Sequence, residues 1–213
     1  RLIMIKDGQV VGDGTPREVL TSEKIRVVYG ADVITSVHPA TGRTFLMPLA
    51  TTNGRITPDK SPYVLVISGG GSGTDLLHFL SHKGFSLTTG ILATTDTDYL
   101  TAKALEISCV PIPPFSHIPA HSLEKLRGLF PEADRIILSM HPMGTGNLPV
   151  LAVLRETDPA RIIIHLPEGR DFPSYDFTKG DAAAVLSDLC AAGAQCTGNF
   201  NGILKLLNKT FSR

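Results

Sequence analysis

The groups best suited to chemistry lie in a glycine-rich run that directly follows the short apolar stretch at residues 64–67. Glycine lets a chain turn tightly and approach another group closely. The apolar residues from Leu76 onward predict a helix that begins at the end of this run, capped by Thr74 or Asp75. Such a helix start presents unpaired N–H groups and a positive dipole end, which suit an anion such as phosphate. The residues concerned are Gly69, Gly70, Gly71, Ser72, Gly73 and Thr74.

The spacing of these glycines leaves three interpretations open. In the dinucleotide-binding pattern Gly-x-Gly-x-x-Gly, the third glycine would stand at Thr74, whereas Gly73 comes one place early. The lysine and the following Ser or Thr of a P-loop are also missing. The run could bind a phosphate or nucleotide, serve dinucleotide redox chemistry, or form a tight strand-to-helix turn that binds nothing.

Two carboxylates, Asp96 and Asp98, follow the next apolar stretch at residues 86–93. They lie about as far along the chain as the acid that holds a ribose in dinucleotide sites. They could bind a ribose hydroxyl or a Mg²⁺ ion beside a phosphate. Alternatively, Asp96 or Thr97 only caps the helix that follows.

A third candidate segment is the loop at residues 141–147, where His141 precedes Gly144, Gly146 and Asn147. Two glycines before a polar helix start could form a second nest of N–H groups for an anion. His141 could donate to a phosphate or act as an acid or base. The alternative is a flexible loop in which Asn147 caps the next helix.

The sequence contains no convincing catalytic or metal-binding set. Ser72 stands near the position of a nucleophile elbow, but Thr74 replaces the last glycine of Gly-x-Ser-x-Gly. His78 and His82 have the spacing of two zinc ligands, but no third ligand is suggested. We therefore expect neither a hydrolase nor a metal site, and no cofactor is assigned to this part of the chain.

Alternating strands and helices must position these residues. The short spacing of the elements after residue 62 predicts an α/β fold, a parallel sheet of about six strands with helices on both faces. Ligands of such sheets bind beyond the carboxyl ends of the strands, where the three candidate segments lie. Strands are predicted at 63–68, 86–93, 107–112, 135–140, 161–165 and 194–197, and helices at 74–83, 97–106, 122–130, 147–156, 179–192 and 200–208.

Composition limits the class of protein. The chain has 213 residues, with 20 Lys and Arg balancing 20 Asp and Glu, which gives no electrostatic reason to expect nucleic acid as a partner. No apolar run approaches the roughly 20 residues of a membrane span. The three cysteines, Cys109, Cys190 and Cys196, form no Cys-x-x-Cys motif and predict buried thiols in a reducing compartment.

The first 48 residues have a different pattern, a small hairpin-plus-helix segment. Residues 2–11 predict a hairpin around Asp7-Gly8, broken at residues 12–14. Thr15, Pro16 and Glu18 predict a capped helix start, and residues 22–28 a second helix. A second hairpin is expected at residues 32–48. The polar residues 50–62 then predict a linker between a segment at 1–49 and a domain at 63–213.

The run Leu2-Ile-Met-Ile-Lys-Asp-Gly-Gln-Val-Val-Gly-Asp-Gly-Thr-Pro-Arg-Glu-Val-Leu-Thr resembles the C-terminal end of an ABC transporter ATP-binding subunit. The residues that follow resemble importers of cobalamin, haem and iron–siderophore complexes. They are Val28-Tyr29-Gly30, Val33, His38-Pro39, Thr41-Gly42-Arg43 and Pro48-Leu49. The Walker motifs, the signature motif and the switch histidine are absent, so we expect no ATP hydrolysis by this part. The resemblance implies a longer parent protein whose missing domain holds ATP and Mg²⁺.

The second part is similar to a Rossmann-like domain appended to some prokaryotic ABC ATP-binding proteins of the cobalamin and iron-chelate type. The matching positions are Gly69–Gly73, Gly84, Gly90, Asp96-Thr97-Asp98, Ala102, Leu105 and Pro114-Phe115-Ser116. This resemblance implies an accessory or regulatory domain that senses a nucleotide or other phosphorylated ligand. Two alternatives stay open, a structural module for dimerisation or docking and a small nucleotide- or corrinoid-related enzyme.

The resemblance also implies partners and a location. The expected partners are the parent ATPase domain and the membrane permease subunits, with a homodimer as a further alternative. The expected location is the cytoplasm, at the inner face of the cell membrane through the transporter.

Overall fold

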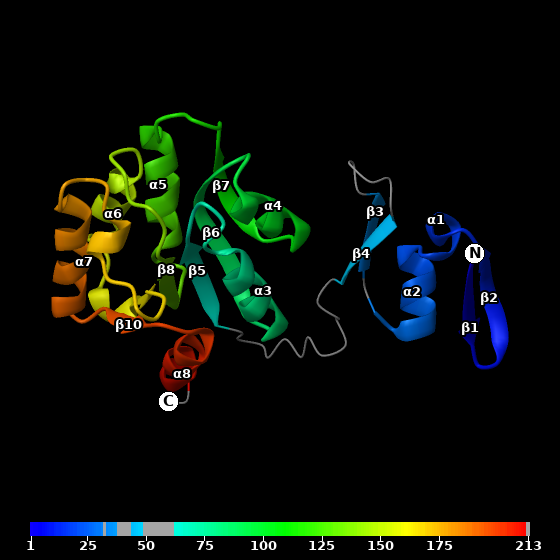
Figure 1. Cartoon of the computed structure of the whole chain (residues 1–213). Coiled ribbons are helices and arrows are strands. Elements are labelled where there is room, and N and C mark those ends of the chain that lie inside the picture. Colours follow the sequence, from blue (N-terminus) through cyan, green and yellow to red (C-terminus); the bar gives the residue numbers. More distant parts are fainter. Residues whose placement is uncertain (32, 38–43, 49–61, 212–213) are drawn as a thin grey trace. The chain divides into compact units, whose positions relative to one another are not determined.

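The computed structural model describes residues 1–31, 33–37, 44–48 and 62–211. The chain divides into two compact units, Arg1–Ile56 and Thr57–Arg213 (Figure 1). The predicted linker at residues 50–62 lies outside the described residues except for Pro62, so its boundaries stay a prediction. Within the described residues, no helix is both long and apolar enough to cross a membrane.

The first unit contains two hairpins and two short helices. Its antiparallel pairs are β1 with β2 and β3 with β4, as predicted. Asp7 and Gly8 both have positive φ, 49° and 78°, as expected for an Asp-Gly hairpin turn. The predicted break at residues 12–14 is wrong, because Gly12 and Gly14 still pair with Met4 and Leu2. The elements are β1 (Leu2–Lys6), β2 (Gln9–Gly14), α1 (Pro16–Val19), α2 (Ser22–Tyr29), β3 (Val33–Val37) and β4 (Thr44–Pro48).

The second unit is a six-stranded parallel sheet covered by helices on both faces, which confirms the predicted fold class. The strands are β5 (Tyr63–Ile67), β6 (Ser86–Ala93), β7 (Ser108–Ile112), β8 (Arg135–Ser139), β9 (Ile162–His165) and β10 (Gln195–Thr197). The α-helices are α3 (Thr74–His82), α4 (Thr97–Ala104), α5 (Ala120–Leu129), α6 (Leu148–Leu154), α7 (Asp181–Ala191) and α8 (Phe200–Phe211). Two short 3₁₀ turns, Pro159–Arg161 and Pro173–Tyr175, complete the unit.

Alternating residues of the central strands build two separate cores. On β5, Leu65 and Ile67 face a core completed by α5, α6 and α7. Val64 and Val66 face the opposite core, completed by α3, α4 and α8. Strands buried on both faces read as continuous apolar runs, which is why this sheet was predictable from the sequence.

The strand order β10-β9-β8-β5-β6-β7 locates the place where a ligand would bind. The chain proceeds outward from β5 through β6 to β7, then crosses back and continues outward from β8. This is the doubly wound order of Rossmann folds, whose ligands occupy the crevice at the carboxyl ends of the two central strands. Here that crevice lies between β5 and β8.

Cys196 differs from its prediction as a buried thiol. It is exposed, and Cys109 and Cys190 are only partly buried. Its strand β10 has three residues and lies at the edge of the sheet, so the core does not cover the side chain. The Cys190 Sγ lies 2.9 Å from the Cys196 Sγ. Partial shielding of the Cys196 thiol from water, together with this contact, raises the pKa of Cys196 to about 12, although the residue as a whole is exposed.

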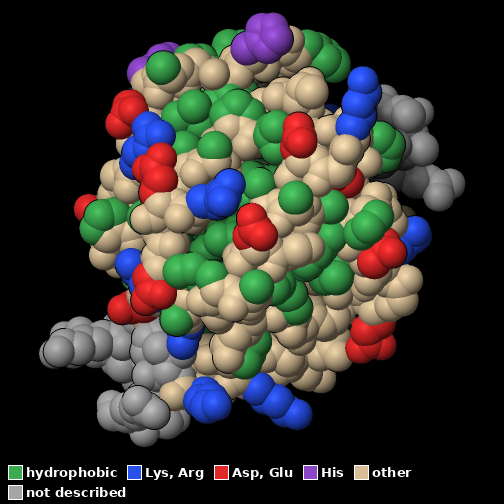
Figure 2. Space-filling model, turned by 90° about the vertical axis from the view of Figure 1, so that its left-hand side faces the viewer, with side chains coloured by type: hydrophobic (Ala, Val, Ile, Leu, Met, Phe, Trp, Pro, Cys, Tyr) green, Lys and Arg blue, Asp and Glu red, His purple; other side chains and the backbone are tan. Residues whose placement is uncertain are grey.

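The surface carries charges of both signs. On the face shown in Figure 2, Lys and Arg side chains lie among Asp, Glu and hydrophobic side chains. A mixed surface of this kind creates no extended field of one sign.

Candidate functional site

A pocket of about 480 Å³ lies at the carboxyl ends of the central strands. Its walls come from the segment after β5, the start of α4, and the loop after β8. It brings together six of the residues predicted for a ligand site, although they are up to 77 positions apart in the chain. These six are Gly69, Gly70, Asp96, His141, Gly144 and Gly146. The other five, Gly71, Ser72, Gly73, Thr74 and Asp98, do not line this pocket.

The glycine run forms a tight turn between β5 and α3. Gly70 and Gly71 have positive φ of 61° and 81°, which glycine adopts without strain. A Cβ atom at Gly73 would overlap the Ser68 hydroxyl. The N-cap of α3 is Gly73, so the predicted caps Thr74 and Asp75 are wrong. Thr74 instead uses its hydroxyl to donate a hydrogen bond to Asp98, 2.9 Å away.

The carboxylate of Asp96 reaches back to this turn. It accepts hydrogen bonds from Gly70 N at 2.8 Å and Gly71 N at 3.2 Å. It also accepts from Asp98 N at 3.0 Å, which makes it the N-cap of α4. The cap interpretation of Asp96 is therefore confirmed, and the same side chain also binds the glycine turn.

Asp98 supplies a second carboxylate to the turn. Its side chain is fully buried and accepts from Gly73 N, with its oxygens at 3.0 and 3.1 Å. Three N–H groups of the turn, those of Gly70, Gly71 and Gly73, therefore donate to carboxylates of the chain itself. A phosphate could use these donors only by displacing Asp96 or Asp98.

His141 lies against the other side of the turn. Its Nδ1 atom is 2.9 Å from the carbonyl oxygen of Ser139. A carbonyl can only accept, so Nδ1 carries the proton and Nε2 of the neutral ring is left as an acceptor. Burial lowers the pKa of His141, while the Ser139 carbonyl and the carboxylates of Asp98 and Asp96 act in the opposite direction. The result is a neutral imidazole near pH 7.

Two serines tie the glycine turn to the end of β8. Ser139 Oγ donates to Ser72 O at 2.8 Å, and Ser72 Oγ donates to Ser139 O at 3.4 Å. The Ser139 carbonyl also orients His141. One residue, Ser139, therefore couples the glycine turn, the end of β8 and the imidazole. Ser72 therefore has a positioning role that the glycine spacing could not indicate.

The loop at residues 141–147 is closed by its own asparagine. Asn147 Oδ1 accepts from Gly144 N at 2.7 Å, and its Nδ2 donates to Pro142 O at 3.0 Å. Asn147 occupies the predicted N-cap position of α6, but its side chain makes no capping bond to the helix. An isolated parallel bridge joins Met143 to Asp176 and holds the far side of the loop.

The rest of the pocket wall is apolar and lacks cations. Five aliphatic side chains contribute to it. Three come from β5, β6 and β7, one from the segment before α5, and one from α6. They are Ile67, Ile91, Ile112, Ile118 and Val150. Among the described residues that line the pocket there is no lysine or arginine. The pocket thus holds the carboxylate of Asp96 with no cationic side chain among its described lining residues, and the apolar part suits an apolar group.

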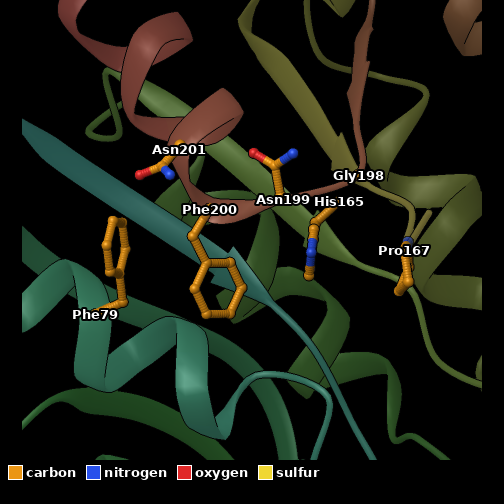
Figure 3. A pocket seen from close by; sticks show the side chains of 7 residues that line it. All are labelled: Phe79, His165, Pro167, Gly198, Asn199, Phe200 and Asn201. Carbon is orange, nitrogen blue, oxygen red and sulfur yellow. The ribbon is translucent and has the colours of Figure 1, made fainter.

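The structure has a second pocket, of about 490 Å³, that the sequence does not indicate (Figure 3). The rings of Phe79, Phe200 and His165 line it, from α3, α8 and β9. The Phe200 ring centroid lies 5.3 Å from that of Phe79 and 5.2 Å from that of His165. These residues are far apart in the chain and none belongs to a recognisable motif, so no local signal could have found the pocket.

Comparison with known proteins places the second unit in a family. The MJ0874 family model matches residues 87–204, more than half of the chain. The chain belongs to the MJ0874 family. The match includes Asp96, Asp98 and His141 but begins after the glycine turn.

Two curated relatives link this family member to ABC importers. The chain is 33% identical over 161 residues to "Cobalamin import ATP-binding protein BtuD" of Halobacterium salinarum, covering 71% of the chain and 40% of the relative. It is 42% identical over 43 residues to "Hemin import ATP-binding protein HmuV" of Plesiomonas shigelloides, covering 20% of the chain and 16% of the relative. The chain is thus similar to ABC importer ATP-binding proteins, and it spans about two fifths of the length of the BtuD proteins.

One solved structure was also found. It is glycinamide ribonucleotide transformylase 1 from Symbiobacterium toebii, with a TM-score of 0.33 and 16% identity. The likeness covers 56% of this chain and 58% of that chain.

Proposed function

We propose that this chain is part of an ABC importer ATP-binding subunit and that its second unit is an accessory, regulatory domain. The similarity to BtuD covers 71% of the chain, which is more than the first unit contains. It therefore extends into the α/β unit. In this proposal the importer takes up cobalamin or an iron chelate, and the partners are the ATPase domain and the permease subunits. The subunit then lies at the cytoplasmic face of the membrane through those partners.

In the same proposal the accessory domain binds a small molecule in the pocket between β5 and β8. The observation that carries this is the convergence of Gly69, Gly70, Asp96 and His141 on one pocket at the switch point of the sheet. Pockets at this position of doubly wound sheets are their usual ligand sites. A nucleotide or other phosphorylated ligand, predicted from the sequence, is one class to be tested. The chain itself carries no ATPase chemistry in this proposal.

A docking module is the second candidate, favoured by one observation. Phe115 is 105% exposed, and it has a positive φ of 54° that is unfavourable for a bulky residue. An exposed aromatic ring in a strained loop is typical of a contact surface. This candidate predicts concentration-dependent association that is lost in Phe115→Ser.

A thermal-shift screen of the whole chain separates the two candidates. The panel comprises nucleosides, nucleotides, inorganic phosphate and corrinoids. A ligand at 100 times its Kd stabilises the folded state by about 2.7 kcal/mol, which raises the melting temperature by several degrees. We expect such a shift for at least one ligand. A panel with no shift, together with a dimer that depends on Phe115, would contradict the sensor and support the docking module.

Matched glycine variants locate the binding site. Gly146 lines the pocket and a Cβ there meets nothing within 4 Å, so the backbone position accepts the side chain of Gly146→Leu. Gly128 on α5 is equally open but lies outside the pocket lining, so Gly128→Leu is the control. We expect the ligand-induced shift to disappear in the first variant and to persist in the second.

A further inference from the structure

We propose that the pocket between β5 and β8 recognises the hydroxyl groups of an uncharged, nucleoside-like ligand, and that it does not bind a phosphate. This inference rests on the proposed function and names the class of ligand. It departs from the usual use of a glycine turn at this position, where backbone N–H groups bind the phosphate. Three features support it: the hydrogen-bond donors of the glycine turn, the acceptors of Asp96 and His141, and the apolar wall of the pocket.

The donors of the turn are already bonded. Gly70 N and Gly71 N donate to Asp96 at 2.8 and 3.2 Å, and Gly73 N donates to Asp98 at 3.0 Å. The two carboxylates thus stand where a phosphate would accept. They also bring negative charge to the place that an anionic ligand would approach, and no lysine or arginine is among the described residues lining the pocket. Like charges close to one another are unfavourable, so an anion is disfavoured here.

Two side chains at the pocket, Asp96 and His141, keep acceptor capacity. Asp96 Oδ2 accepts only from Gly70 N among the described residues, and a carboxylate oxygen can accept more than one hydrogen bond. The Nε2 atom of His141 is an acceptor because Nδ1 donates to Ser139 O. Both side chains line the same pocket. A ligand that matches them must donate hydrogen bonds, as the hydroxyls of a ribose do.

One further polar atom is unsatisfied. Ser68 is 5% exposed, and its Oγ has no hydrogen-bond partner among the described residues. A buried polar group without a partner is rare and costly in a native protein. The Ser68 Oγ lies against the glycine turn, because a Cβ at Gly73 would overlap it, and Gly73 does not line the pocket. We therefore do not count this hydroxyl among the groups offered to a ligand.

The apolar wall requires a second part of the ligand. Ile67, Ile91 and Ile112 lie at the carboxyl ends of three adjacent strands, and Ile118 and Val150 continue the surface. Burying an apolar ring against this wall is favourable, whereas a simple sugar would leave it unmatched. A ligand that joins an uncharged ring to vicinal hydroxyls fits both parts, which is the chemistry of a nucleoside.

Isothermal titration of the whole chain with three matched probes tests the inference. The probes are adenosine, 2′,3′-dideoxyadenosine and AMP. We expect adenosine to bind, the dideoxy compound to bind at least tenfold more weakly, and AMP to bind more weakly than adenosine. AMP binding more tightly than adenosine, or equal binding of the dideoxy compound, would overturn the inference while leaving a ligand site in place. Binding of none of the three would also overturn the inference. If, in addition, no ligand of the thermal-shift panel binds, the proposed function is contradicted as well.

Two variants test the acceptors themselves. Asp96→Asn removes one acceptor oxygen, and His141→Asn keeps a donor for the Ser139 carbonyl while removing Nε2. Each should weaken adenosine binding about tenfold. Asp96 also holds the glycine turn, so Asp96→Asn could fail to fold. In that case His141→Asn and the three probes test the inference. Unchanged adenosine affinity in a folded variant would contradict the role given to that residue.

Discussion

At the scale of single residues, Asp98 is the most constrained side chain of the candidate site. Its carboxylate is fully buried, and it accepts hydrogen bonds from Gly73 N and Thr74 Oγ. The turn and the carboxylate stabilise each other, because each supplies partners that the other could not obtain from solvent. Removing one side of such a pair leaves buried polar groups unsatisfied.

We therefore expect Asp98→Ala to lower the free energy of unfolding by about 2–4 kcal/mol, since two donors lose their partner. Asp98→Asn should cost less, because the amide keeps one acceptor oxygen. Urea unfolding at pH 7 provides the measurement. Asp188→Ala on α7 is the control. Within the described part of the chain this exposed carboxylate has a single ion pair, a 3.6 Å contact with Arg155, so its removal should change stability by less than about 0.5 kcal/mol. Equal effects of the two alanine variants would contradict the role of Asp98.

Asp176 gives the chain a pH-dependent helix cap. Its carboxylate accepts from Ala183 N at 2.8 Å and from both the N–H and the hydroxyl of Thr178. These bonds, with that of Ala183 first, lower the pKa of Asp176 from 3.8 to about 2. A lowered pKa in the folded state means that the stabilisation is present above about pH 4 and is lost as the pH falls towards 2.

The variant Asp176→Asn should therefore be less stable than the wild type at pH 7, and the difference should shrink between pH 4 and pH 2. Urea midpoints of both proteins at pH 7, 4, 3 and 2 measure this convergence. A difference that is independent of pH would show that ionisation of Asp176 contributes nothing to the cap.

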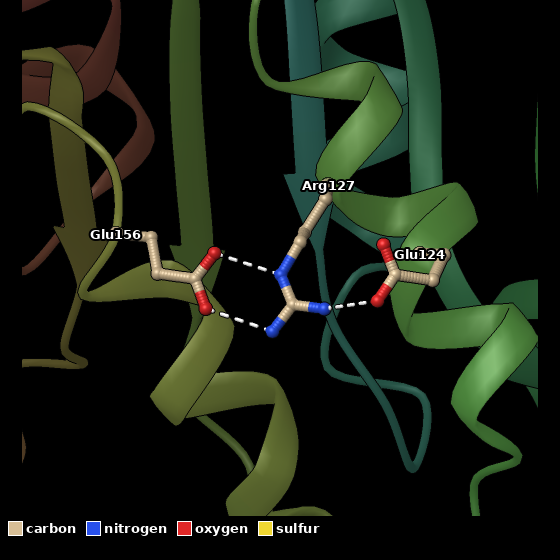
Figure 4. A network of polar contacts seen from close by, with 3 residues as sticks. All are labelled: Glu124, Arg127 and Glu156. Carbon is tan, nitrogen blue, oxygen red and sulfur yellow. Dashed lines mark hydrogen bonds and ion pairs between the residues drawn. The ribbon is translucent and has the colours of Figure 1, made fainter.

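At the scale of the elements, an arginine joins α5 to the turn after α6 (Figure 4). Arg127 donates from Nε and Nη2 to the two oxygens of Glu156 at 2.7 and 2.8 Å, and from Nη1 to Glu124. The paired bonds need the planar fork of a guanidinium, which an ammonium group cannot reproduce.

We expect Arg127→Lys to lower the melting temperature slightly at low ionic strength, with a smaller loss in 0.5 M salt, because these groups are exposed and screened. Calorimetry at two salt concentrations provides the measurement. If the decrease in melting temperature does not change with salt, it comes from altered packing of the side chain and not from its charge.

Gly128 weakens α5 near its C-terminal end. It is exposed, its φ is not positive, and a Cβ there meets nothing within 4 Å. Replacing an exposed helical glycine by alanine gains up to about 1 kcal/mol, and less near a helix end. Gly128→Ala should raise the free energy of unfolding by about 0.5 kcal/mol, measured by urea unfolding. A destabilised variant would indicate that α5 ends before this residue.

Most elements could be predicted because each carries a local signal. The strands β5, β8 and β9 are short apolar runs, and the glycine turn marks the step from β5 to α3. The contacts of Asp96 and Asp98 with that turn could not be predicted, because they join residues about 25 positions apart through side-chain geometry. The extension of β2 through Gly14 was missed because pairing with β1 overrides the low strand propensity of glycine.

At the scale of the whole molecule, a member of the MJ0874 family carries a short segment and an α/β unit that are similar to ABC importer ATP-binding proteins. In the proposed accessory role, a ligand bound in the α/β unit could change the activity of an importer, because both parts belong to the same chain. Such regulation requires that the ligand binds two states of the subunit with different affinity.

The central claim is that a small molecule binds between β5 and β8, and amide chemical-shift mapping of the whole chain tests it most directly. Adenosine is titrated into isotope-labelled protein, and the amide signals are followed. We predict that the largest shifts fall on residues lining the pocket, including Gly69, Gly70, Gly144 and Gly146. Shifts centred instead on the pocket of Phe79 and Phe200, or the absence of shifts at saturating ligand, would contradict the account.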